Sequence, residues 1–156
     1  MSKRKPPSGP AKAARHDAPA PEDLRDFAPC AGCMSFALRR AARAMSQHYA
    51  KHLRPTGLRG TQFTMLATLV TGGPMPISRM ARRLGLERTT LTRNLKPLEA
   101  KGWIAVTEDE DRRVHVVSVT AKGRAMARKA LPAWHKAQET ARAKIKELRL
   151  DVLFAA

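Results

Sequence analysis

The sequence predicts a mainly α-helical fold with one small β-hairpin. Three observations favour it. Apolar residues recur at helical spacing through most of the chain after residue 32. Two β-branched runs, at residues 103–107 and 114–120, flank a charged loop, as the strands of a hairpin do. Aromatic residues make up only 4% of the chain, which favours helices that pack through Leu, Val, Met and Ala.

The charge of the chain favours a polyanionic partner. The 156 residues include 30 Lys and Arg against 13 Asp and Glu, a formal net charge of +17. No apolar run approaches the roughly 18 residues that span a membrane, and no apolar segment follows the basic start of the chain, which argues against a secretory signal. We therefore expect a cytoplasmic, nucleoid-associated protein that does not bind membranes.

Residues 1–29 differ in composition from the rest of the chain. They contain more than half of the eleven prolines and few large apolar residues. This composition predicts a disordered basic arm. Such an arm is either a solvated tail or a segment that binds phosphates or a minor groove, and both interpretations stay open. A single domain is expected over residues 30–156.

Apolar periodicity predicts four helices before the hairpin. The first covers residues 33–53 and ends before Pro55. The second covers residues 61–71, before a Gly-Gly-Pro sequence. The segment "ISRMARRLG", residues 77–85, predicts a short third helix with a glycine turn. The fourth is expected over residues 87–101.

One long helix is expected after the hairpin. Thr120 is a suitable N-cap for it, because a threonine hydroxyl can accept a hydrogen bond from the first turn. Pro132 is expected to kink this helix or to divide it in two, because an interior proline removes a backbone hydrogen bond.

The third and fourth helices have the spacing of a helix-turn-helix. This motif needs a small residue where its helices touch, a glycine for the turn and an aliphatic residue in the second helix, as Ala81, Gly85 and Leu91 provide. Leu91, Leu95 and Leu98 form one stripe toward the core. The opposite side suits base edges and phosphates in a major groove. The predicted DNA-binding residues are Arg88, Thr89, Thr90, Thr92, Arg93 and Lys96.

The hairpin loop "EDEDRR" is a second candidate DNA contact. Asp111 is expected to hold Arg113 in a bidentate pair while Arg113 enters the minor groove, with Arg112 beside it. An exposed loop with compensating charges is the alternative that the sequence leaves open.

This order of elements resembles the winged helix-turn-helix regulators of the MarR (multiple antibiotic resistance regulator) family. The segments that match are "TQFTMLATL", "RTTLTRNLKPLEAKGWI" and "DEDRRVHVVSVTAKGRA". The last is the most specific, because Asp111 and Arg113 precede a β-run that ends in Thr120 and Gly123. The resemblance implies a bacterial repressor of transcription, with a winged helix-turn-helix at residues 61–119 and dimerisation helices at residues 30–55 and 121–156.

The resemblance also implies a homodimer that binds double-stranded DNA at a palindromic operator. The apolar stripes of the first helix and of residues 131–150 agree, because a single winged helix cannot cover them. Packing within one chain is the alternative for each residue. The candidate contacts are Ala41, Ala42, Met45, Leu131, Trp134, Ile145 and Leu148.

A small-molecule effector is implied as well, such as a phenolic acid or a lipophilic drug between the dimer helices and the DNA-binding lobe. Plain packing or solvation is the alternative for each candidate. The candidates for the lining are Met45, His48, Tyr49, His52, Phe63 and Trp134, and those for a carboxylate contact are Arg39, Arg40 and Arg43.

Cys30 and Cys33 fit a reducing compartment better than a disulfide scaffold. One branch of the resembled family senses hydroperoxides with a cysteine near the start of the first helix. Alignment of residues 36–38 with that branch places Ser35 at the reactive position. Cysteines at helix N-termini near arginines are nevertheless prone to oxidation, so a redox-sensing regulator is the alternative function.

Other classes of function have weaker support. His48 and His52 are four residues apart, but no carboxylate accompanies them, so no metal site and no cofactor are predicted. No catalytic triad order, phosphate-binding glycine loop or paired-carboxylate site is visible, so an enzyme is not expected. A non-specific architectural DNA-binding protein is the second alternative.

Overall fold

The computed structural model describes residues 21–108 and 114–147. The chain forms two compact units, one that ends at Arg39 and one that begins at Arg40. The predicted loop contacts Asp111, Arg112 and Arg113 lie outside the described residues, as do residues 1–20 and the dimer candidate Leu148.

The first unit contains helix α1 (Pro21–Phe27), a 3-10 turn (Ala28–Gly32) and the first residues of α2 (Met34–Leu53). The prediction of an irregular arm as far as residue 29 is therefore wrong for residues 21–29. Pro21 starts α1, where its fixed φ suits the first helical position. Glu22 in the first turn and Arg25 in the last turn complement the helix dipole.

The second unit begins within α2, and its next helix is α3 (Gly60–Gly72). A 3-10 turn over Arg54–Thr56 links the two helices, and the Thr56 hydroxyl donates to the Leu53 carbonyl at 2.6 Å. The Gln62 side chain accepts a hydrogen bond from the Arg59 N–H at 3.0 Å, which fixes the start of α3. Both helices agree with the predicted ranges.

A three-stranded antiparallel sheet has the order β1-β3-β2. The strands β2 (Ile104–Glu108) and β3 (His115–Val119) confirm the predicted hairpin, with Ile104 opposite Val119. The sequence did not predict β1 (Met75–Pro76), whose Met75 pairs with Val117. Pro76 has no N–H to donate, which is tolerated because β1 is an edge strand.

The core of the second unit lies between α3, α4 (Ile77–Leu84), α5 (Arg88–Ala100) and the sheet. Leucine, alanine and methionine dominate it, as the low aromatic content predicts, whereas Val117 is the one fully buried valine among the described residues. Its largest fully buried side chains are Leu53, Leu66, Leu69, Met75, Met80, Leu91, Leu98 and Val117.

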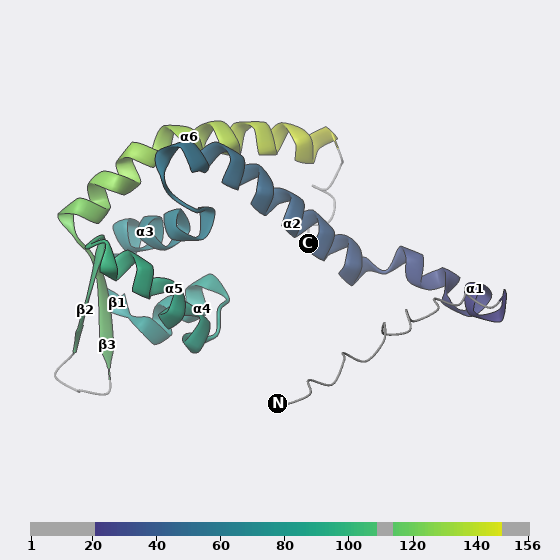
Figure 1. The fold of residues 1–156 in the computed structure, drawn as a ribbon, viewed down its shortest axis with the longest axis horizontal. Helices are drawn as coiled ribbons and strands as arrows, with labels where there is room; N and C mark the ends of the chain where they lie inside the picture. The colour runs from purple at the N-terminus through teal and green to yellow at the C-terminus, as the bar shows by residue number, and fades with distance from the viewer. Residues whose placement is uncertain (1–20, 109–113, 148–156) are drawn as a thin grey trace, which may run out of the picture. The chain divides into compact units, whose positions relative to one another are not determined.

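Helix α6 (Ala121–Glu147) is one continuous helix that contains Pro132. The proline therefore does not divide it, and Figure 1 shows α6 curved along its length, beside α2 and α3. The predicted cap is confirmed, because the Thr120 hydroxyl accepts from the Gly123 N–H at 3.0 Å. The same hydroxyl donates to the Gly102 carbonyl at 2.7 Å, which ties the start of α6 to the end of α5.

None of the helices within residues 21–108 and 114–147 is long and apolar enough to cross a membrane.

Gly123 allows α6 to approach the start of β2 closely. A Cβ at this position would lie 1.9 Å from the Trp103 carbonyl oxygen, which is backbone and cannot move aside cheaply. We expect Gly123→Ala to lower the free energy of unfolding by about 3 kcal/mol, measured by urea denaturation. Gly60→Ala is the matched control, because nothing lies within 4 Å of its added Cβ. An equal loss in both variants would show that the close contact is not the cause.

Candidate nucleic-acid interface and cavity

Helices α4 and α5 form the predicted helix-turn-helix. Gly85 has φ 62°, a left-handed conformation that suits glycine, and the Leu86 N–H donates to the Ala81 carbonyl at 2.9 Å. Ala81 is 4% exposed and Leu91 is fully buried where the two helices pack. The three residues that predicted the motif therefore have the positions that it requires.

Helix α5 has two chemically different sides. Leu91, Leu95 and Leu98 are 0–2% exposed and pack into the core. The predicted DNA-binding residues lie away from this stripe: Thr90 is half-buried, and Arg88, Thr89, Thr92, Arg93 and Lys96 are exposed. The Thr92 hydroxyl donates to the Arg88 carbonyl at 2.9 Å. Because this proton is already used, Thr92 can contact a base edge through its methyl group or as a hydrogen-bond acceptor.

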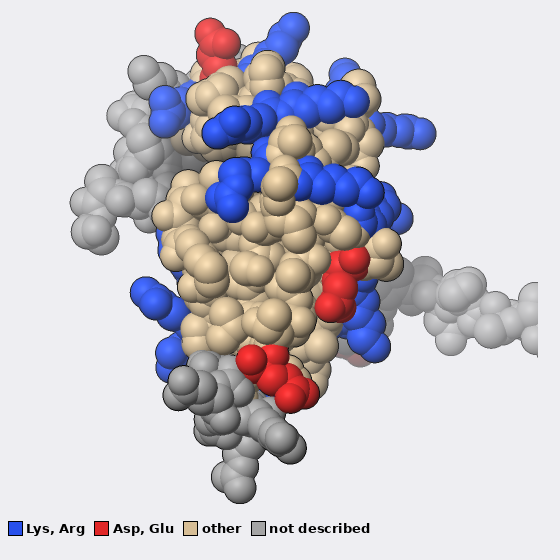
Figure 2. Space-filling view, turned by 90° about the vertical axis from the view of Figure 1, so that its left-hand side faces the viewer, with Lys and Arg blue, Asp and Glu red and all other residues tan. Residues whose placement is uncertain are grey.

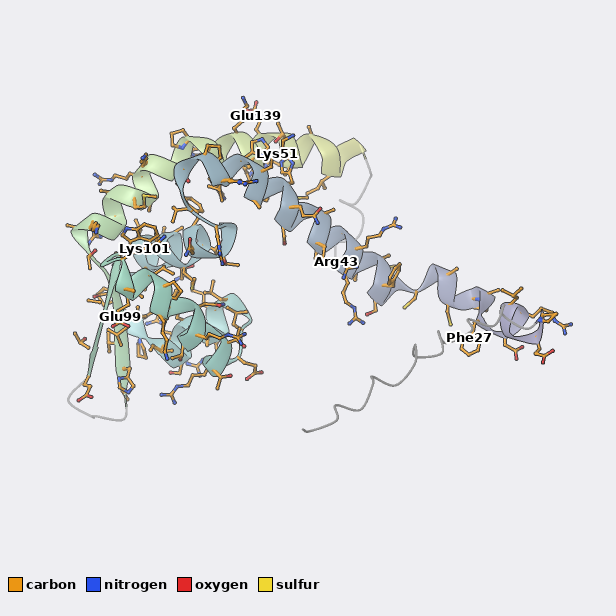
Figure 3. The ribbon with its side chains drawn as sticks, viewed as in Figure 1. Phe27, Arg43, Lys51, Glu99, Lys101 and Glu139 are labelled. Carbon is orange, nitrogen blue, oxygen red and sulfur yellow. The ribbon has the colours of Figure 1, made fainter. Side chains whose placement is uncertain are left out.

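Pro97 lies within α5 without ending it, because the helix continues to Ala100. The first half of α5, with Arg88, Thr92 and Arg93, precedes this proline. At the other end of the helix Lys101 lies 4.5 Å from the centre of the Trp103 ring, so its ammonium group contacts the aromatic face. Figure 3 shows Glu99 and Lys101 at this end of α5.

Further exposed cations lie on α4, within the helix-turn-helix, and on α6. Arg79, Arg82 and Arg83 are exposed on α4. On the side of the molecule shown in Figure 2, lysine and arginine side chains gather over α6 in the upper part, while acidic side chains are few. The exposed cations at the start of α6 are Lys122, Arg124, Arg128 and Lys129.

A cavity of about 990 Å³ lies in the second unit, between the C-terminal half of α2, the start of α3, the helix-turn-helix and α6. Most of its lining is apolar, and the Phe63 and Trp134 rings stack there with centroids 6.0 Å apart at 26°. Arg54 and Arg59 also line it, and among the described lining residues there is no acidic side chain. The cavity therefore suits a flat apolar molecule with one anionic group.

Four of the predicted effector residues line this cavity: Met45, Tyr49, Phe63 and Trp134. The Tyr49 hydroxyl donates to the Gln138 side chain on α6, so its proton is already used within the chain. Ala42, a dimer candidate, lines the cavity as well.

The expectation is corrected for His48, His52 and Arg43, which do not line the cavity. Met45, Tyr49 and Leu53 share one side of α2, and the two histidines lie on the next side, toward α6. Arg43 is exposed on α2 (Figure 3). Arg39 belongs to the first unit, where it donates to the Ser35 hydroxyl at 2.8 Å.

His48 instead joins α2 to α6. Its Nε2 lies 3.0 Å from the Ala137 carbonyl and 3.0 Å from the Thr140 hydroxyl oxygen. The Thr140 hydroxyl already donates to the Lys136 carbonyl, so Nε2 carries the proton of this contact. The ring of His52 lies 4.7 Å from that of His48, and its Nδ1 bonds the His48 carbonyl. In the part of the chain that the structure describes, no group of three metal-ligating side chains occurs.

Sequence reasoning missed Arg54, Arg59 and Asn94 as lining residues. Arg54 and Arg59 flank the turn between α2 and α3, and Asn94 is half-buried on α5. No spacing in the sequence brings these three segments together. The only signal was the position of Asn94 next to the leucine stripe of α5.

Cys30 and Cys33 are both free and exposed in the first unit. They lie one turn apart, with the Cys33 N–H donating to the Cys30 carbonyl at 3.1 Å.

Comparisons with known proteins agree on one family. The model of the MarR family matches residues 58–115, from two residues before α3 to the first residue of β3. The transcriptional regulator MosR of M. tuberculosis, solved in complex with DNA, is 40% identical and has a TM-score of 0.69. The similarity covers 78% of this chain and 91% of MosR. The chain belongs to the MarR family.

Two curated relatives are similar to about half of this MarR-family chain. The uncharacterised HTH-type transcriptional regulator YwoH of Bacillus subtilis is 34% identical over 83 residues, which cover 53% of this chain and 61% of YwoH. The transcriptional repressor MprA of Escherichia coli K12 is 38% identical over 88 residues, which cover 54% and 50%. The chain thus spans between half and two thirds of the curated relatives that it matches.

The link through His48 gives a test of how α2 is held against α6. We expect His48→Leu to lower the free energy of unfolding by about 1 kcal/mol, because the hydrogen bond to α6 is lost. His52→Leu is the control, since the Nδ1 of His52 bonds only its own helix. A change below about 0.5 kcal/mol is expected there. Equal effects in urea denaturation would contradict the assignment of His48 as the link.

Proposed function

We propose that the chain is a homodimeric repressor of transcription that binds a palindromic operator and leaves it when a small aromatic or acidic molecule enters the cavity. The exposed side of α5, with its cations and hydroxyls, is the observation that carries this proposal. A buried leucine stripe holds that side outward at the end of a helix-turn-helix. The MarR family membership and the DNA complex of MosR support it.

The chemistry of α5 matches a major groove. Arg88 and Arg93 offer paired donors that fit the O6 and N7 of guanine, and Thr92 offers a methyl group to thymine. Cations on α4 and α6 add phosphate contacts, which give affinity without sequence preference. In a dimer the two α5 helices meet half-sites roughly 34 to 36 Å apart.

A homodimer accounts for the exposed apolar side chains at both ends of the described chain. Met34, Phe36 and Leu38 are 47–58% exposed in the first unit, and Leu131 is 41% exposed on α6. Exposed large apolar side chains in each unit are what an interface between two copies requires. A second copy that covers the dimer candidates Ala41, Leu131 and Ile145 removes this surface from water.

A second candidate is a redox-sensing regulator of the same fold. The pair Cys30 and Cys33 favours it, because both thiols are exposed and lie one turn apart at the start of α2. It shares the DNA contacts of the first candidate and differs in its trigger, an oxidant instead of a ligand.

Arg93 tests whether α5 reads sequence. The duplex is selected from a random pool with the full chain, and affinity is measured by fluorescence anisotropy at fixed salt. We expect Arg93→Ala to weaken binding to the selected duplex about 5- to 150-fold, equivalent to about 1 to 3 kcal/mol, and to affect random duplex less. Arg128→Ala is the matched control: it removes one exposed arginine from α6, a phosphate contact in this proposal, so it is expected to weaken binding to the selected and random duplexes alike.

Deletion of residues 1–20 completes this test. We expect it to weaken binding to the selected and random duplexes alike, since the arm supplies only charge. If the deletion abolished all binding and Arg93→Ala had no effect, the chain would be an architectural basic protein instead.

Arg54 and Arg59 test the class of ligand. We expect the double variant Arg54→Gln, Arg59→Gln to bind 2-naphthoate about five- to tenfold more weakly, measured by titration calorimetry. Exposed ion pairs contribute only a little each, which limits the effect. The neutral 2-naphthamide is the control ligand, and its affinity is expected to change less than about twofold. Equal losses for both ligands would rule out an anion contact at these arginines.

A further inference from the structure

The exposed side of α6 carries cations along most of the helix. We call this surface the α6 ridge. Residues 121–138 contain no aspartate or glutamate, and the first acidic residue of the helix is Glu139. The blue side chains over α6 in Figure 2 belong to this side of the molecule. The ridge consists of Lys122, Arg124, Arg128, Lys129 and Lys136, all of them exposed.

This distribution of charge is unfavourable for the helix itself. Opposite charges four residues apart stabilise an exposed helix, and like charges at that spacing destabilise it. Arg124 and Arg128 are a pair of like charges at that spacing, and no acid compensates them within residues 121–138. An anionic partner would supply the missing compensation.

The ridge lies opposite the buried side of α6. Gly123, Ala127 and Ala130 are buried where the helix packs on the rest of the second unit. Lys122, Lys129 and Lys136 follow one another at intervals of seven residues, which is two helical turns. They therefore form one line on the exposed side, roughly 21 Å long.

The ridge is separate from the side of α5 that suits a major groove. The start of α6 is tied to the residues just after α5, because the Thr120 hydroxyl donates to the Gly102 carbonyl at 2.7 Å. Arg88 begins α5 and lies roughly 18 Å from Ala100 at its end. Figure 1 shows α6 on one side of α3 and α5 on the other. A straight duplex along the first half of α5 therefore leaves the ridge uncovered.

The chemistry of the ridge favours nucleic acid over an acidic protein. Interfaces between proteins are depleted in lysine and are built around large aromatic or apolar anchors. Between the cations of the ridge the exposed residues are small, namely Ala125 and Pro132. A duplex presents one negative charge per roughly 1.7 Å of its axis, so a line of lysines meets several phosphates at once.

The proposed dimer leaves the line of lysines accessible. Leu131, a dimer candidate, follows Lys129 by two residues, which places the two side chains on nearly opposite sides of α6. A second copy that covers Leu131 therefore does not cover Lys129.

We propose that the α6 ridge binds the phosphates of a second stretch of duplex while α5 occupies the operator, so that one dimer bridges two segments of DNA. This inference rests on the proposed function, and it assigns the phosphate contacts of α6 to the second segment. The second segment is bound without sequence preference, because the ridge contacts only phosphates.

A capture assay tests the bridge. The selected duplex is immobilised and saturated with the full chain, so that both half-sites are occupied. A fluorescent random duplex is then added, and its captured amount is measured over a series of salt concentrations. We expect the wild-type chain to capture the random duplex, with an affinity that falls as salt rises.

The triple variant Lys122→Gln, Lys129→Gln, Lys136→Gln removes the line of lysines. We expect its affinity for the random duplex to fall at least about tenfold. The slope of log affinity against log salt should become shallower by about 2 to 3, because three phosphate contacts are lost at about 0.9 each. Affinity for the immobilised duplex should change less than about threefold, which shows that the variant is folded. Arginine at the same three positions keeps the charges and should restore capture.

The variant Arg40→Gln, Arg43→Gln, Lys51→Gln is the matched control. It removes the same charge from exposed positions on α2 (Figure 3 labels Arg43 and Lys51). We expect its capture of random duplex to change less than about threefold. An equal loss in both triple variants would show that net charge, and not the ridge, holds the second duplex.

Three further outcomes would overturn the inference. One is a wild-type chain that captures no second duplex. Another is full capture by the glutamine variant, since other cations would then hold the duplex. The third is a ridge that binds fluorescent poly-glutamate but no duplex, which would indicate an acidic protein partner. Failure of the proposed function looks different, because the wild-type chain would then show no preference for the selected duplex over random duplex.

Discussion

Burial of the leucine stripe of α5 is the interaction on which the account depends. Leu91, Leu95 and Leu98 are each almost fully buried, and each contributes about 1.5 to 3 kcal/mol by leaving water. This burial fixes the rotation of α5 about its own axis. A half-turn would place Arg93 in the core and the leucines in water, which costs far more than any contact it could gain. The cationic side therefore faces outward as a consequence of packing.

The same packing places the cavity beside α5. The end of α5 is tied to the start of α6 through Thr120, whose hydroxyl bonds both Gly102 and Gly123. On the side of the core that faces α2 and α3, the cavity lies between apolar side chains and two arginines, Arg54 and Arg59. Helix α5 and the residues that line the cavity thus belong to one packed body. Regulation by a ligand requires such a connection between the ligand site and the part that moves.

The helices and the hairpin could be predicted because each has a local signal, such as the leucine spacing of α5 or the β-branched run before Thr120. The strand β1 could not, since Met75 and Pro76 form a strand only by pairing with Val116 and Val117. Helix α1 was missed because its capping signals lie in a proline-rich segment. The lining of the cavity was predicted only in part, since four of its residues were among the ligand-binding candidates. Periodicity placed Met45 and Tyr49 together, but the side of α2 that faces α6, and the approach of Asn94, depend on tertiary packing.

The most direct test of the central claim is a crystal structure of the full chain with a duplex selected from a random pool. The quantity to measure is the distance from the Arg88, Thr92 and Arg93 side chains to base edges. We expect the N-terminal half of α5 to lie in the major groove, with hydrogen-bond distances of roughly 2.7 to 3.2 Å. A complex in which α5 faces away from the duplex, with the contacts made by other cations, would contradict it.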